Sequence, residues 1–337
     1  MTITTSASEI FQLHGVQIRL VADDMLLGDA ARAFLRPAHV DHVAADVDDG
    51  QQSGQIILSL LRSEAPQHPP AQAHLWMDVD GLRLLADERD VYLLIDGHYM
   101  GLLRTSEHAI TIWVSDADDT DAWTIGHMLI QPLLCEALRA FGLVSLHAAA
   151  LADGDRVAIF PAVSGSGKTT LALALLRGGF KLLSDDSPFV RREGNTIVAR
   201  AFAEALNVTG ETVAFFPELR AVWQQHIVSG EEGKAAIASE KIYGDCLGVM
   251  GEVEAVIFPE ACMADRTVVE TMAKAEALVR LLPLTMTSAS PAYTLQQFRL
   301  LSDLVRTTPC YRMRTGQDFA EQPMIVRNLL RGRDTRE

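Results

Sequence analysis

One continuous stretch, residues 156–186, constrains the fold of this 337-residue chain more than any other feature. The apolar run RVAIFPA leads directly into the glycine-rich loop AVSGSGKTT, and a helix-forming segment without interior glycine or proline follows. A phosphate-binding loop requires this order, because it must join the end of a buried strand to the start of a helix. Strands also alternate with helices on both sides of the loop, so the sequence predicts an α/β core.

The loop residues are suited to holding a nucleoside triphosphate. Gly165 and Gly167 permit backbone conformations that turn successive N–H groups toward phosphate oxygens, and the helix N-terminus adds the positive end of its dipole. We expect Lys168 to reach the β- and γ-phosphates of ATP, and the Thr169 hydroxyl to bind Mg²⁺. The predicted nucleotide-binding residues are Ser164, Gly165, Ser166, Gly167, Lys168, Thr169 and Thr170.

Three more polar residues lie one element away from this loop. Asp185 and Asp186 follow the short strand FKLLS after the helix. His147 lies in VSLHAAAL, which can pair with RVAIFPA through the turn ADGD and so bring the imidazole near the loop. One carboxylate can bind Mg²⁺ while the other accepts a proton from an attacking hydroxyl. The alternatives are a solvated Asp-Asp turn, a core histidine and a glycine-rich turn with an exposed lysine.

The remainder of the chain divides into a β-rich part and an α/β part. Five short apolar or alternating runs predict strands over 15–22, 54–61, 74–79, 91–96 and 109–114. A long helical stretch is expected over 122–141, favoured by the acidic residues of 115–121, kinked at Pro132 and stopped at Gly142. Helices near 272–282, 294–306 and 317–331, with a strand at CYRMR, complete the chain. We therefore place a β-rich N-terminal region over 1–118 and a catalytic domain over 119–337.

Charge and composition exclude several classes of protein. With 29 basic and 44 acidic residues the formal net charge is −15, which repels phosphate backbones and excludes a nucleic-acid partner. The most apolar stretch, 125–144, carries Glu136 and Arg139, so a membrane span is not expected. The N-terminus lacks the pattern of a secretory signal, and the four cysteines form no CxxC pair. We expect a cytoplasmic protein and leave homo-oligomerisation open.

Residues 145–186 resemble a known family. The stretch SLHAAALADGDRVAIFPAVSGSGKTTLALALLRGGFKLLSDD is similar to the catalytic core of HPr kinase/phosphorylase in its histidine-bearing strand, loop, helix and Asp-Asp pair. The resemblance implies a P-loop core with a mixed sheet, of the kind shared with phosphoenolpyruvate carboxykinase. It also implies that His147 and Lys168 lie at the reacting phosphate, that Asp185 acts as acid/base, and that Asp186 binds Mg²⁺ together with Thr169. The sequence departs from the family pattern at Ala162 and Thr170, where the family commonly has glycine and glutamate.

The resemblance favours an ATP- and Mg²⁺-dependent serine kinase that acts on a protein or peptide. The helix before LHAAAL and the closing TTPCYRMRTGQDFAEQPMIVRNLL resemble stand-alone HPr-kinase-like proteins, including those that phosphorylate lasso-peptide precursors. By analogy, Lys234 in GEEGKAAIASEKIYGD would stabilise the transferred phosphate; a solvated loop is the alternative. Two other functions remain as alternatives. One is a small-metabolite kinase, for which Arg280 is a candidate carboxylate ligand, and the other is a non-catalytic ATP-binding regulator.

Overall fold

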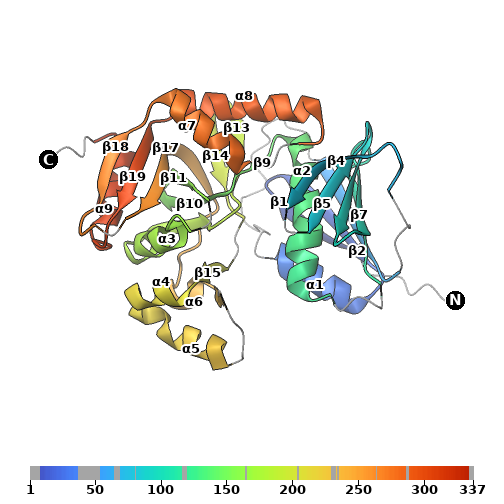
Figure 1. Ribbon diagram of the computed structural model, residues 1–337, viewed down its shortest axis with the longest axis horizontal. Helices are drawn as coiled ribbons and strands as arrows, with labels where there is room; N and C mark the ends of the chain where they lie inside the picture. Colours follow the sequence, from blue (N-terminus) through green and yellow to red (C-terminus); the bar gives the residue numbers. More distant parts are fainter. Residues whose placement is uncertain are drawn as a thin grey trace. The chain divides into compact units, whose positions relative to one another are not determined.

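The computed structural model describes residues 8–36, 54–63, 69–79, 81–115, 120–163, 165–202, 205–228, 233, 235–262, 264–285 and 288–333. The chain forms two compact units, Met1–Leu143 with Thr287–Leu295 and Val144–Met286 with Gln296–Glu337. Each unit combines a mixed sheet with helices, which confirms the α/β class (Figure 1). The units divide at 143/144 rather than at the predicted 118/119. The reason is that the helical stretch after residue 121 packs on the first sheet, where Leu133 lies against Gly101.

The first unit is built on an eight-stranded sheet in the order β1-β2-β3-β8-β7-β6-β5-β4. Its elements are β1 (Glu9–Leu13), β2 (Val16–Ala22), α1 (Met25–Leu35), β3 (Gly54–Leu61), β4 (His74–Val79), β5 (Leu82–Ala86), β6 (Asp90–Ile95), β7 (His98–Arg104), β8 (Ala109–Trp113), η1 (Thr124–Ile130), α2 (Gln131–Leu138) and η2 (Arg139–Phe141). The five predicted strands are confirmed as β2, β3, β4, β6 and β8. Helix α1 was not predicted, although Asp24 is a clear N-cap whose carboxylate accepts the N–H groups of Leu26 and Leu27 at 2.9 and 3.0 Å.

The predicted helical stretch 122–141 is present but is not one regular helix. It begins with the π-helical η1, where the Asp121 carboxylate accepts the N–H of Thr124 at 2.7 Å, and continues as α2 and η2. Pro132 lies in the first turn of α2, directly after η1, at the point where the π-helical segment gives way to an α-helix. Gly142, with φ of 75°, ends the stretch as expected. Residues 116–119 of the acidic run lie outside the described residues.

A buried ion pair lies in this unit. Glu136 and Arg139 on consecutive turns are both 2% exposed and lie 3.0 Å apart, and the Ser288 hydroxyl donates to Glu136 at 2.5 Å. We expect Glu136→Ala to lower the free energy of unfolding by about 3–5 kcal/mol, because it leaves the guanidinium buried without its carboxylate. Urea unfolding followed by circular dichroism measures this. Glu107→Ala, which removes an exposed pair with Arg104, is the control and should change stability by less than about 1 kcal/mol. Equal effects of the two variants would contradict the prediction.

The second unit contains a nine-stranded mixed sheet with the central order β12-β10-β11-β17-β14-β13-β9, extended by β19 and β18 beside β17. The strands of this sheet are β9 (Val144–Ser145), β10 (Ala148–Asp153), β11 (Arg156–Pro161), β12 (Lys181–Ser184), β13 (Phe189–Glu193), β14 (Thr196–Arg200), β17 (Met250–Ala261), β18 (Val268–Thr271) and β19 (Cys310–Thr315). A separate two-stranded sheet pairs β15 (Leu206–Val208) with β16 (Ala235–Ile237). The helices of this unit are α3 (Lys168–Arg177), α4 (Gly210–Phe215), η3 (Pro217–Leu219), α5 (Arg220–Val228), α6 (Glu240–Tyr243), α7 (Lys274–Leu281), η4 (Leu282–Leu284), most of α8 (Pro291–Thr307) and α9 (Gln322–Leu330). The predicted C-terminal helices and the strand CYRMR are confirmed as α7, α8, α9 and β19.

Successive side chains of the sheet point to opposite faces and pack into two separate hydrophobic cores. Ala149 and Leu151 of β10 face the core beneath α3 and α9, whereas Ala148, Ala150 and Ala152 face the core beneath α7 and α8. The sheet therefore lies between two helical layers, as Figure 1 shows for this unit. Burial on both faces explains why the AAALA of β10 and the VAIFP of β11 are unbroken apolar runs. None of the helices in the described part of the chain combines the length and the apolar composition that crossing a bilayer requires.

Candidate functional site

The glycine-rich loop connects β11 to α3 with the backbone that the sequence predicts. Gly165 and Gly167 have φ of 83° and 87°, a region that favours glycine, and α3 begins at Lys168. The loop is held by β17, because the N–H of Ala261 donates to the Ser166 carbonyl at 3.2 Å. A Cβ on Gly167 would lie 3.1 Å from that of Ala261. The loop conformation therefore depends both on glycine and on a strand end almost a hundred residues away.

One carboxylate oxygen of Asp186 contacts both Lys168 and His147. Lys168 Nζ lies 2.7 Å from Asp186 Oδ1, and His147 Nδ1 lies 3.2 Å from the same oxygen. Lys168 Nζ is also 3.3 Å from His147 Nε2. The ammonium is buried at 8% exposed, whereas the His147 and Asp186 side chains are 39% and 43% exposed. The structure thus brings together the lysine of the loop, the histidine and one of the paired aspartates, with the last two open to solvent.

His147 occupies a break between two strands. The residues before it form β9, which pairs with β13, and the residues after it form β10, which pairs with β11 and β12. The His147 N–H donates to the Leu284 carbonyl at 2.7 Å, outside either ladder. Thr285, next to Leu284, accepts from the buried amide of Gln297 at 2.6 Å, which fixes that turn. The segment VSLHAAAL, predicted as one strand, is therefore two strands, β9 and β10. His147 lies between them and belongs to neither.

The Asp185 side chain does not join this cluster and instead contacts Thr169 of the loop. The Thr169 hydroxyl donates to Asp185 Oδ2 at 3.1 Å, and the residue is 4% exposed. Its other oxygen, Oδ1, is buried and makes no hydrogen bond of standard geometry among the described residues, although the backbone of Asn207 contributes to lowering the pKa of this carboxyl. A buried carboxylate oxygen with spare acceptor capacity beside a threonine hydroxyl fits Mg²⁺, which takes oxygen ligands and is commonly bound by one or two protein groups plus substrate phosphates.

A buried serine orients the two aspartates and was not predicted. The Ser184 hydroxyl, fully buried, accepts the N–H groups of Asp186 and Ser187 at 3.3 and 2.9 Å. This side-chain turn ends β12 and sends Asp185 and Asp186 to different sides. A serine directly before an Asp-Asp pair at the end of a strand is the sequence signal that indicates such a turn.

The two aspartates have opposite pKa shifts. Burial raises the pKa of Asp185 to about 6, and the charge of Lys168 and the Thr169 hydrogen bond offset only part of that effect. For Asp186 burial also acts to raise the pKa, but the hydrogen bond from His147 and the charge of Lys168 outweigh it and hold the pKa well below its usual range. Asp186 is therefore ionised at neutral pH, and Asp185 carries the cost of an ionised buried carboxyl.

The raised pKa predicts how stability depends on pH. Folded Asp185 titrates at about 6 and an unfolded aspartate at 3.8, so between these values the folded state binds more protons and stability falls as pH rises. Asp185→Asn removes this titration. We expect the unfolding free energy of Asp185→Asn, relative to wild type without ligand, to increase by about 2–3 kcal/mol between pH 4 and pH 7. Urea unfolding at a series of pH values measures it. A difference that is constant with pH would show that Asp185 is not desolvated.

The remaining predicted residues lie apart from this cluster. Thr170 does not face the aspartates; its hydroxyl lies 3.5 Å from that of Thr212 on α4. Ser166 turns back on the loop and donates to the Val163 carbonyl at 2.8 Å. Ser164 and Lys234 lie outside the described residues.

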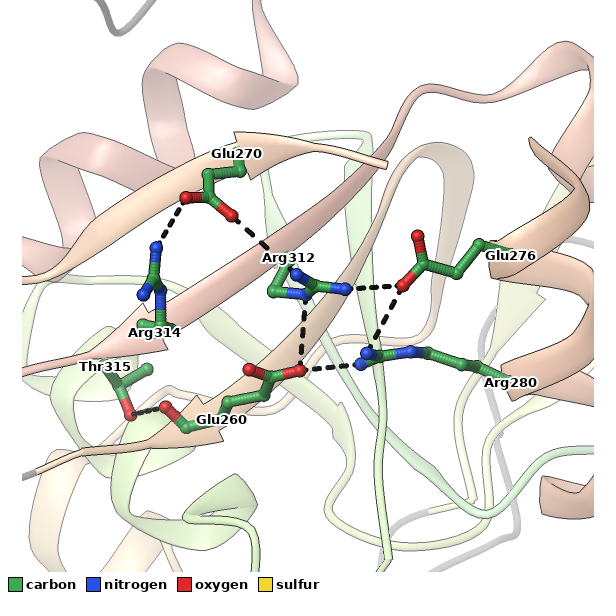
Figure 2. A network of polar contacts seen from close by, with 7 residues as sticks. All are labelled: Glu260, Glu270, Glu276, Arg280, Arg312, Arg314 and Thr315. Atoms are coloured by element: carbon green, nitrogen blue, oxygen red, sulfur yellow. Dashed lines mark hydrogen bonds and ion pairs between the residues drawn. The ribbon is translucent and has the colours of Figure 1, made fainter. Parts of the chain in front are cut away.

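Arg280, the candidate carboxylate ligand of the metabolite-kinase alternative, is already paired. Its guanidinium contacts Glu260 at 2.7 Å and Glu276 at 3.3 Å. Figure 2 shows these residues in one network with Arg312 and Glu270 of the neighbouring strands, where three arginines face three glutamates. A substrate carboxylate would have to displace a protein carboxylate from this network.

Comparisons with known proteins give little further information. No protein family model matches the chain, and no curated protein does. Among solved structures it is similar to the HPr(Ser) kinase/phosphatase from Coxiella burnetii, at 16% identity and a TM-score of 0.31, covering 56% of this chain and 94% of that chain. A likeness of this size transfers neither an activity nor site residues, so the function is inferred from the geometry described above.

Proposed function

We propose that the chain is an ATP- and Mg²⁺-dependent phosphotransferase that phosphorylates a serine hydroxyl of a protein or peptide. The observation that carries this proposal is the meeting of Lys168, His147 and Asp186 at the start of α3, directly after a loop with two left-handed glycines. Such a loop and helix start present backbone N–H groups to phosphates, and the lysine adds a charge. An exposed carboxylate beside them gives the acceptor hydroxyl a place to lose its proton.

In the proposed reaction the serine oxygen attacks the γ-phosphorus, the bond from that phosphorus to the β,γ-bridging oxygen breaks, and ADP leaves. Lys168 stabilises charge on the phosphate oxygens, and His147, which lies against both Lys168 and Asp186, holds these two groups in position. Asp186 accepts the serine proton. Most of the rate enhancement comes from positioning and charge stabilisation, as is general for phosphoryl transfer.

Access decides which aspartate we propose as the base. The pKa of about 6 would suit Asp185 to proton transfer, but that side chain is buried and bonded to Thr169. Asp186 is 43% exposed and adjoins both Lys168 and His147. Because a base must first reach the proton, we propose Asp186 as the base and Asp185 as the metal ligand, the reverse of the assignment that the family resemblance implies.

Thr169 and Asp185 would hold Mg²⁺, which supplies neutralisation of the phosphate charge. The unpartnered Oδ1 of Asp185 supports this role, because that oxygen lacks a hydrogen bond in the described residues. A lasso-peptide precursor that carries a serine belongs to the proposed class of acceptor.

Transfer of radiolabel from γ-labelled ATP tests the proposal against both alternatives. Label on a polypeptide supports it, label on a small molecule favours a metabolite kinase, and label on free phosphate alone favours an ATP-binding regulator. Binding of Mg-ATP is measured by calorimetry in the same preparation. Loss of the heat signal when Mg²⁺ is omitted would support the metal site, and absence of any ATP binding would overturn the proposal.

A further inference from the structure

The backbone of His147 is held from two sides. The N–H groups of Leu146 and Ala148 donate at 3.0 Å to carbonyls of the segment 186–188, whereas the His147 N–H donates to the Leu284 carbonyl at 2.7 Å. Successive N–H groups of an extended chain point to opposite sides, so the bond to Leu284 holds residue 147 on the side away from that segment. The imidazole is 39% exposed, and its placement therefore depends largely on where the backbone carries it.

Thr285 determines the direction of the Leu284 carbonyl. That carbonyl and the Thr285 N–H belong to one planar peptide group, so they turn together. The Thr285 N–H donates to the Leu282 carbonyl at 3.3 Å, and the Thr285 hydroxyl donates to the same oxygen at 2.8 Å. These two bonds close the turn 282–285 and direct the Leu284 carbonyl toward the His147 N–H.

Gln297 of α8 completes this turn. Its side-chain amide donates to the Thr285 hydroxyl at 2.6 Å, and the two residues are only 6% and 8% exposed. Gln297 occupies a core position, because it lies on the buried face of α8 with Leu300, Leu301 and Leu304. A buried amide costs free energy unless it makes hydrogen bonds, so packing alone would favour an apolar residue there. The glutamine therefore indicates a role for its hydrogen bond.

The contacts of the imidazole are sensitive to this support. His147 Nδ1 lies 3.2 Å from Asp186 Oδ1, and Nε2 lies 3.3 Å from Lys168 Nζ. Both distances are at the long end of the hydrogen-bond range, so a displacement of residue 147 by about 1 Å would remove the contacts.

We infer that Gln297 is a positioning residue of the candidate site. Through Thr285 it fixes the carbonyl that binds the His147 N–H, and so keeps the imidazole against the lysine of the loop and Asp186. This inference rests on the proposed function, in which the imidazole holds those two groups in position. Because a misplacement of about 1 Å can cost about 10²-fold in rate, we expect loss of the Gln297 hydrogen bond to lower turnover by about tenfold.

Gln297→Met and Gln296→Met form a matched pair for the test. Both replace an amide by a thioether of similar length on the same helix, but Gln296 is exposed. Consumption of γ-labelled ATP is followed at saturating Mg-ATP with a mixture of synthetic serine peptides as acceptor, and Mg-ATP affinity is measured by calorimetry. Gln297→Met should lower turnover about tenfold with the affinity within about twofold of wild type, and Gln296→Met should change neither.

Thr285→Val and Thr285→Ser separate the hydrogen bond from packing. Valine has the shape of threonine but cannot accept from Gln297, whereas serine keeps the hydroxyl. Thr285→Val should therefore be as slow as Gln297→Met, and Thr285→Ser should turn over within about twofold of wild type. A merely structural role would lower the unfolding temperature without this pattern. Each variant is therefore assayed below its own unfolding temperature, which circular dichroism measures.

The ring nitrogens of His147 report its position without any need for turnover. In protein with ¹⁵N-labelled histidine, the signals of His147 are those that disappear in His147→Ala. At a single pH, Lys168→Met should shift these signals in the wild-type background, where Lys168 Nζ lies 3.3 Å from the ring. In the Thr285→Val background the same substitution should leave them unchanged.

Three results would overturn the inference. They are wild-type turnover by Gln297→Met, equally slow turnover by Thr285→Ser and Thr285→Val, and an equal response of the His147 signals to Lys168→Met in both backgrounds. A wild type that binds no Mg-ATP, or consumes none, would instead show that the proposed function fails. The His147 signals would then decide the positioning role by themselves.

Discussion

Lys168→Met is expected to lower the rate of phosphate transfer by about 10²–10³-fold and to weaken ATP binding. Methionine keeps the length of the side chain but removes the charge. In the structure that charge is buried between Asp186 and His147, at 2.7 and 3.3 Å. Initial rates at saturating Mg-ATP and calorimetric titration measure the two effects separately.

Lys181→Met provides the control for this substitution. Lys181 lies at the other end of β12 and pairs with Asp245 at 2.7 Å on the surface, so its loss should change neither rate nor affinity. Both variants are compared well below the unfolding temperature, because Lys168→Met also leaves Asp185 and Asp186 without a neighbouring cation. Wild-type turnover of Lys168→Met would disprove the assignment of the loop.

Asp186→Asn is expected to lower turnover by about 10²–10⁴-fold while Mg-ATP binding stays within a few-fold of wild type. The asparagine amide can still contact His147, but it cannot accept the serine proton. Asp185→Asn should behave differently, because that carboxyl is buried beside Thr169 and carries the unpartnered oxygen. There we expect a higher Mg²⁺ concentration for half-maximal ATP binding. Titrations of rate and binding against Mg²⁺ separate the two outcomes.

The exposed Asp155, in the turn between β10 and β11, supplies the matched control Asp155→Asn, which should alter none of these quantities. If Asp186→Asn loses Mg-ATP binding while Asp185→Asn binds normally but does not turn over, the roles are those implied by the family resemblance. Equal loss of both properties in the two variants would mean that the carboxylates act as one unit.

Sequence patterns over a few residues predicted those strands and helices that are determined by interactions between residues close together in the chain. The runs over 54–61 and 74–79 coincide with β3 and β4, because alternating or unbroken apolar residues are a direct signature of a strand in a sheet. Helix α1 was missed within a region that otherwise consists of strands, although Asp24 and the spacing of Leu27, Ala31 and Leu35 indicate it. The π-helical η1 was not predicted as such; in the structure it packs against α1, where Phe34 lies beside Gly126.

The same limit applies to the site. The proximity of His147 to Lys168 follows from a hairpin, a short-range feature that the turn ADGD indicates, and the structure places the two side chains 3.3 Å apart. The different environments of Asp185 and Asp186 depend on the Ser184 turn and on the side chains that each carboxylate contacts. Two identical neighbouring residues in the sequence give no sign of this difference. The Leu284 carbonyl that holds His147 comes from far along the chain, and no local pattern predicts such a contact.

The bond between Ala261 and Ser166 has a consequence for the growing polypeptide. Residues 156–179 contain every letter of the glycine-rich motif, yet the strand that braces the loop is completed only at residue 261, and β19 beside it at Thr315. A nascent chain that has emerged only as far as α3 therefore has the motif without its supporting frame. Competence to retain nucleotide should arise late in translation, and fragments truncated before β17 should lack it even though they include the whole motif.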